Sequence, residues 1–118
     1  MIVPKLYGIH SPDVVDLKLF VPDVPNKFSI LIQVFVGPEG DEGFESFDFV
    51  VCTADWLDEK YKNEIVFLRN FILVPYYSYS ALYQRIEKLV KSISGDDWTE
   101  YATKLSRWGQ WEFEGYKK

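Results

Sequence analysis

The strongest pattern along the chain is the β-branched and aromatic stretch from Phe28 to Val36. Every second residue in this stretch is apolar, as in a strand that turns one face towards a core. Leu31 and Phe35 make the alternate positions apolar as well. This predicts a central strand covered on both sides.

A second strand is predicted from Phe44 to Val51, where Phe47 and Phe49 alternate with polar residues. The connection between the two strands, residues 37–43, holds three glycines and one proline, which favour turns. The two strands therefore form a hairpin with a long tip. Weaker patterns predict further strands over residues 5–9, 17–21, 65–74 and 110–113.

Three helices are predicted between and after these strands. Thr53 can cap a short first helix, and Ser80 can cap a second whose apolar residues follow helical spacing up to Ile93. Asp97 and Glu100 have the spacing of a capping box and open a third. The order of elements predicts an α+β fold, a largely antiparallel sheet with two or three helices packed on one face.

Composition fits one folded domain over residues 1–118. Apolar residues make up 47% of the chain and aromatic residues 18%, which excludes a disordered segment. The longest apolar stretch is far shorter than the ~20 residues that span a membrane. The start of the chain lacks the pattern of a secretory signal, and a single cysteine, Cys52, allows no internal disulfide. A cytoplasmic protein is expected.

Charge is distributed unevenly. Residues 28–59 hold eight acidic residues and no basic one, whereas the rest holds 13 basic and 10 acidic residues. The acidic segment would repel nucleic acid and attract a basic partner. The alternative is a surface that only keeps the protein soluble.

Little in the sequence predicts catalysis. The single histidine, His10, is expected in a turn, because its neighbours Ser11 and Asp13 are too close in sequence to be assumed to form a triad. Cys52 is expected to be a small buried residue, with a reactive thiol at a helix start as the alternative. One cysteine and one histidine exclude the usual zinc spacings, and no cofactor is predicted. Two alternatives stay open, a small enzyme using a pair of carboxylates and a calcium-dependent binding module on residues 39–45.

Three segments carry a more specific pattern: His10-Ser11-Pro12-Asp13; residues 37–57, with Glu42-Gly43, Glu45-Ser46-Phe47-Asp48-Phe49-Val50-Val51-Cys52-Thr53 and Trp56-Leu57; and Trp98, Leu105, Arg107, Gly109 and Trp111-Glu112-Phe113-Glu114. Together they resemble the immunity protein 8 family from about His10 to Glu114. The shared positions suggest that Phe47 and Phe49 serve the core, Gly40 and Gly43 the turn, and Thr53 the helix cap.

The resemblance implies a bacterial antidote that binds a toxin domain in the cytoplasm and blocks it without chemistry of its own. Such antidotes are encoded beside polymorphic or contact-dependent growth-inhibition toxins, many of which are nucleases with basic clefts. The implied partner is thus a basic toxin C-terminal domain, with no nucleic acid and no membrane. The residues expected to form the toxin-binding acidic face are Glu39, Asp41, Glu42, Glu45, Asp55, Trp56, Asp58 and Glu59. A monomer or weak homodimer is expected, the latter through an edge strand at Trp111.

Overall fold

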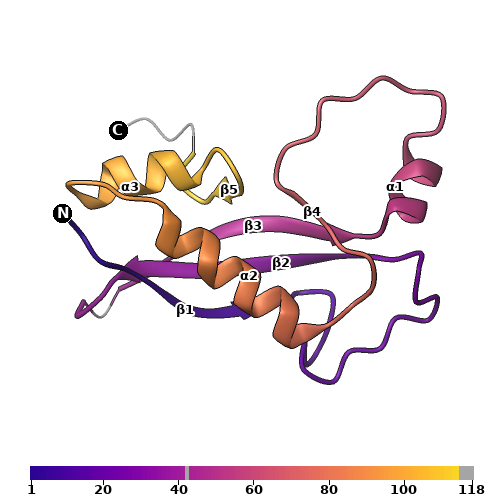
Figure 1. Ribbon diagram of the computed structural model, residues 1–118, viewed down its shortest axis with the longest axis horizontal. Coiled ribbons are helices and arrows are strands. Elements are labelled where there is room, and N and C mark those ends of the chain that lie inside the picture. The colour runs from indigo at the N-terminus through magenta and orange to yellow at the C-terminus, as the bar shows by residue number, and fades with distance from the viewer. Residues whose placement is uncertain (42, 115–118) are drawn as a thin grey trace.

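The computed structural model describes residues 1–41 and 43–114. In chain order its elements are β1 (Pro4–His10), β2 (Ser29–Pro38), β3 (Glu45–Cys52), α1 (Ala54–Lys60), β4 (Phe71–Leu73), α2 (Tyr79–Ser92), α3 (Trp98–Leu105) and β5 (Gln110–Trp111). The fold is of the α+β class, as the sequence predicted (Figure 1). No helix among the described residues is long and apolar enough to cross a membrane.

The strands form one open, mixed sheet in the order β1-β2-β3-β4. β1, β2 and β3 are antiparallel neighbours, whereas β4 runs parallel to β3. β3 shares its outer edge between two short strands. Residues 47–48 pair with β5, and residues 50–52 pair with β4.

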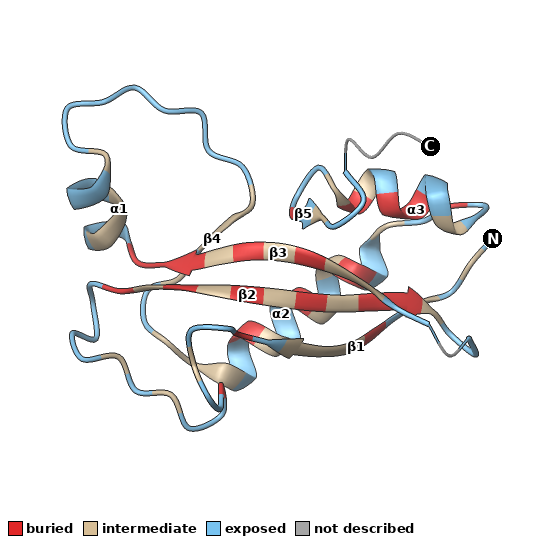
Figure 2. Ribbon diagram, turned by 180° about the vertical axis from the view of Figure 1, so that it is seen from behind, coloured by how far each residue is buried: buried red, intermediate tan, exposed pale blue. Residues whose placement is uncertain are grey.

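The core lies between the sheet and the helices α2 and α3. α2 crosses in front of the strands in Figure 1 and behind them in Figure 2, so it covers one face of the sheet. α1 lies beyond the end of β3 and buries none of its residues. The most deeply buried side chains come from β2, β3, α2 and α3: Ile32, Val34, Val36, Phe47, Val51, Val90, Tyr101 and Leu105.

The prediction of a β2 strand covered on both sides was half right. β2 is central, but the positions that alternate with its buried residues, Leu31 and Phe35, are only half-buried. None of the described helices lies over this side of the sheet (Figure 2). Apolar side chains on both faces of a strand indicate that each face is partly shielded from water. They do not indicate that a helix covers each face. We call this second side of the sheet the open face.

The strand predicted over residues 17–21 does not form. Leu17 is buried, but Leu19 and Val21 are exposed, and the backbone turns where the carbonyl of Asp16 accepts from Leu19 N at 3.1 Å. The Asp16 carboxylate also accepts from Lys18 N, at 2.9 Å. Such local hydrogen bonds from an aspartate compete with strand formation, which explains the difference.

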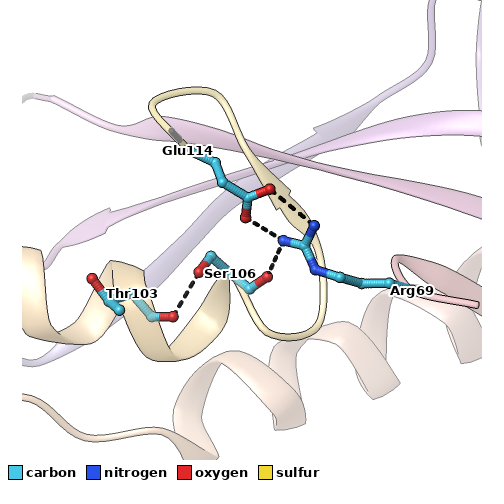
Figure 3. A network of polar contacts seen from close by, with 4 residues as sticks. All are labelled: Arg69, Thr103, Ser106 and Glu114. Carbon is cyan, nitrogen blue, oxygen red and sulfur yellow. Dashed lines mark hydrogen bonds and ion pairs between the residues drawn. The ribbon is translucent and has the colours of Figure 1, made fainter. Parts of the chain in front are cut away.

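The strand predicted over residues 65–74 shortens to β4. Ile65 and Phe67 are almost fully exposed, because β5 already pairs with the part of the β3 edge that a longer β4 would need. The segment is held by Arg69, whose guanidinium binds Glu114 with both nitrogens (one at 2.9 Å) and also donates to the Ser106 carbonyl (Figure 3). Arg69 thereby ties the loop before β4 to the segments after α3 and β5.

Helix starts follow the predictions with two changes. α2 begins two residues early, because Ser78 rather than Ser80 caps it and accepts from Ala81 N at 3.3 Å. Asp97 caps α3 as predicted, accepting from Glu100 N at 2.8 Å. Thr53 stands at the start of α1, but its hydroxyl oxygen accepts from Phe28 N at 3.2 Å instead of capping the helix.

Candidate functional site

The residues around His10 hold the end of the sheet together. Beyond the end of β1, Ser11 donates to the Leu31 carbonyl at 2.6 Å, and Asp13 accepts from Leu31 N at 2.8 Å. The two side chains thus provide hydrogen-bond partners for the backbone of Leu31 in β2, at a point where β1 no longer pairs with β2. His10 lies against the ring of Phe35, with centroids 6.5 Å apart. His10 is the last residue of β1 and pairs with Gln33, so the expectation of a turn histidine is wrong by one residue, and the turn begins after it.

The thiol of Cys52 is buried, and its burial raises its pKa. A reactive thiol needs exposure and a lowered pKa, so the alternative for Cys52 is wrong. Burial outweighs the influence of the short helix that follows.

The acidic residues predicted to form one face lie in two separate groups. Glu39 and Asp41 are exposed at the tip of the β2–β3 hairpin, whereas Asp55, Asp58 and Glu59 are exposed on α1. Glu42, expected with the first group, lies outside the described residues. The groups stand at opposite ends of β3 (Figure 1), which at ~3.3 Å per residue separates them by roughly 25 Å.

The carboxylate of Glu45 is occupied inside the protein. Its Oε1 accepts from Nε1 of Trp98 and from Nε1 of Trp111, each at 2.8 Å. Trp98 begins α3 and Trp111 ends β5, so one oxygen joins both elements to β3. Sequence analysis assigned Glu45 to a binding face and missed this role, although all three residues stand in the segments that carry the family pattern.

Trp111 lies in β5, a short strand that pairs on one side with β3. Its ring stacks on Phe47 with centroids 6.2 Å apart, and Gln110–Trp111 pairs with β3 of the same chain. The other edge of β5 pairs with no described strand, so the weak homodimer through Trp111 stays a prediction.

The acidic group on α1 has polar partners of its own. Asp55 accepts from the amide of Asn26 at 3.0 Å, and Glu59 forms an ion pair with Lys27. The hydrogen bond to Glu59 raises the pKa of Lys27. Trp56, the proposed aromatic anchor, is half-buried. Asp58 is exposed and has no hydrogen bond or ion pair within the described residues.

The described residues of the segment 39–45, which leave out Glu42, do not form a cation site. Glu45 is held by two indoles, and the described residues contain no group of three or more histidine, cysteine, aspartate or glutamate side chains that could hold a metal ion.

The open face contains a feature that the sequence analysis missed. His10 pairs with Gln33, Gln33 with Asp48, and Asp48 with Gln110, so four polar residues lie in one row across four strands. Oδ1 of Asp48 is buried and has no hydrogen-bond partner among the described residues. Alternation with Phe47 and Phe49 already placed Asp48 on this face. Its burial depends on pairing with Gln110, 62 residues along the chain, which the pattern does not contain.

Comparison with known proteins identifies one family. A model described as Immunity protein 8 matches residues 4–116. No curated protein and no solved structure matches the chain.

Proposed function

The chain belongs to the Immunity protein 8 family, and on this basis we propose that it protects the cell that makes it by binding and blocking one cognate toxin domain. The observation that carries the proposal is the family match over residues 4–116. The toxin is the C-terminal domain of a polymorphic or contact-dependent growth-inhibition toxin. The two proteins meet in the cytoplasm, and inhibition needs no catalysis by the antidote.

The charge distribution supports a basic toxin surface, such as that of a nuclease. Residues 28–59 carry eight acidic residues without a basic one. The acidic residues at the hairpin tip, Glu39 and Asp41, and those on α1, Asp55, Asp58 and Glu59, flank the sheet at its two ends. Glu42 adds a further negative charge to the sequence between residues 39 and 45. Charges in such positions accelerate the encounter with an oppositely charged partner. Trp56 completes the α1 group as an aromatic contact residue.

The first experiment is titration calorimetry with the toxin domain encoded beside this chain, at low and at high salt. Nanomolar binding that weakens as salt rises is the expected result, because exposed charge pairs are screened. Rescue of growth when the antidote is expressed together with the toxin domain is expected as well. If the purified partners do not bind at either salt concentration, the proposed function is wrong.

A pair of variants tests the role of the acidic groups. Glu39→Lys with Asp41→Lys changes the hairpin tip, and Asp58→Lys changes α1, while Glu45 stays unchanged because it is structural. Each variant is expected to lower the association rate about tenfold with little change in the dissociation rate. Asp96→Lys, an exposed position before α3, is the matched control and is expected to bind as the unchanged protein does. Equal association rates in all variants would exclude electrostatic steering by these residues.

A further inference from the structure

The open face of the sheet is built from half-buried residues with no layer of helices over them. On β2 and β3 these are Leu31, Gln33, Phe35, Ser46, Asp48 and Val50. The strands are long and regular here, so the face is a fixed surface and not a mobile loop. Figure 2 looks onto this face, where strand residues of intermediate burial alternate with the buried ones that point to the helices.

The residues of this face lie in three rows across the strands. The middle row is polar and consists of His10, Gln33, Asp48 and Gln110. One neighbouring row is apolar, since Leu31 pairs with Val50 and Val50 with Phe71. The other contains Phe35, whose ring lies against Phe44 with centroids 4.9 Å apart. The polar row is therefore bordered by an apolar row on one side and by Phe35, which pairs with Ser46, on the other. Neighbouring contacts of this kind can exclude water from a central polar contact.

Asp48 is the only acidic residue in the middle row, and it lacks a donor. Its Oδ1 is enclosed without a hydrogen bond from any described residue, whereas the residue as a whole is half-buried. Burial and the nearby Glu112 raise the pKa of Asp48, so keeping this carboxylate ionised costs folding free energy. A buried polar atom without a partner in a native structure requires an explanation.

We propose that the open face is the surface that docks the cognate toxin, and that the Asp48 carboxylate forms a hydrogen-bonded ion pair with an arginine or lysine of that toxin. The inference rests on the proposed function and adds its binding surface. A cation from the partner compensates the charge of this carboxylate, and the apolar side chains Leu31, Val50 and Phe35 are covered at the same time. The hairpin tip and α1 then form the charged rim of the interface.

Charge complementarity favours a basic toxin over a second copy of this chain. In a symmetric dimer the same patch is used by both copies, so two open faces would bring two Asp48 carboxylates into one interface. Like charges placed together in this way oppose binding. A basic toxin is also the partner that the acidic groups at both ends of the sheet would attract.

Two variants test the proposal by different means. Asp48→Asn removes the charge and keeps the shape of the side chain. Gln33→Lys places an ammonium group directly opposite Asp48, on the neighbouring strand, where it can satisfy the carboxylate from within. Both variants are expected to melt at or above the temperature of the unchanged protein, since Asp48→Asn removes the unpaired buried charge and Gln33→Lys pairs it. Both are expected to bind the toxin domain encoded beside this chain at least 30-fold more weakly, mainly through faster dissociation.

Asp96→Asn is the control, because it removes one exposed carboxylate before α3 and leaves the open face unchanged. Weak binding by both variants, with normal melting and a control that binds normally, supports the proposal. If the unchanged protein binds tightly and either variant keeps that affinity, the open face is not the docking surface and the proposed function stands. If the unchanged protein does not bind the toxin domain, both proposals fail together.

Discussion

At the residue scale, Glu45 accepts two indole N–H groups on one carboxylate oxygen. Glu45→Ala leaves both indoles without this acceptor. At about 1–3 kcal/mol for each unsatisfied donor, two donors give roughly 2–6 kcal/mol of unfolding free energy, and a loss in the lower half of this range is expected because both tryptophans are half-buried. Glu45→Gln keeps an acceptor oxygen and should lose less. Urea unfolding followed by tryptophan fluorescence measures the difference.

Glu39→Ala is the control for this prediction, because Glu39 is exposed in the same connection between β2 and β3. It is expected to change the unfolding free energy by less than about 0.5 kcal/mol. A Glu45→Ala variant as stable as this control would show that the two indole contacts contribute nothing to stability.

Asp48 gives the stability of the protein a characteristic dependence on pH. The pKa of Asp48 is raised above its ordinary value of 3.8 in the folded protein. The contribution of its protonated form to the free energy of unfolding is therefore complete below pH 3.8, and it is lost as pH rises through the native pKa. Asp48→Asn stays neutral throughout. The variant should therefore be more stable than the unchanged protein at pH 7, and this advantage should shrink towards pH 3. Urea titrations of both proteins across this range test it, and an advantage independent of pH would contradict the raised pKa.

At the element scale, Arg69 anchors the segment between α1 and β4. Arg69→Lys cannot bind the Glu114 carboxylate with two nitrogens, so residues 61–70 should open more often. We expect chymotrypsin to cut at Phe67 several-fold faster, while the unfolding free energy falls by about 1 kcal/mol or less, because the pair is partly exposed. Lys62→Ala in the same segment is the control. Equal rates of cleavage in Arg69→Lys and in the unchanged protein would mean that the ion pair does not restrain the loop.

The elements that could be predicted from the sequence are those whose pattern is long and self-sufficient. β2, β3, α2 and α3 follow from runs of eight or more residues with one clear period. The length of β4 could not be predicted, because it is set by how much of the β3 edge β5 leaves free. The prediction of a strand over residues 17–21 failed for a related reason. Apolar residues alternate there, but no described strand pairs with the segment. Pairing between distant strands is not contained in a local pattern.

At the scale of the whole molecule, the acidic segment of the sequence does not become one acidic surface. β3 runs through the middle of that segment and carries its two halves to opposite ends of the sheet. The sequence could therefore predict the excess of negative charge and the kind of partner that this charge attracts. It could not predict that the charge is divided between the two ends of the sheet. The open face between the two groups could not be predicted either, because it exists only where helices pack on one side and not on the other.

The contact of Glu45 with Trp98 and Trp111 joins residues 53 and 66 positions apart. A ribosome releases the β2–β3 hairpin well before these tryptophans. Until residue 111 emerges, the carboxylate has no indole to bind, and Phe47 lacks the ring that stacks on it. A nascent chain or a product truncated before α3 thus exposes the part of the core around Phe47 to proteases, and each new molecule becomes durable only once residue 111 has emerged.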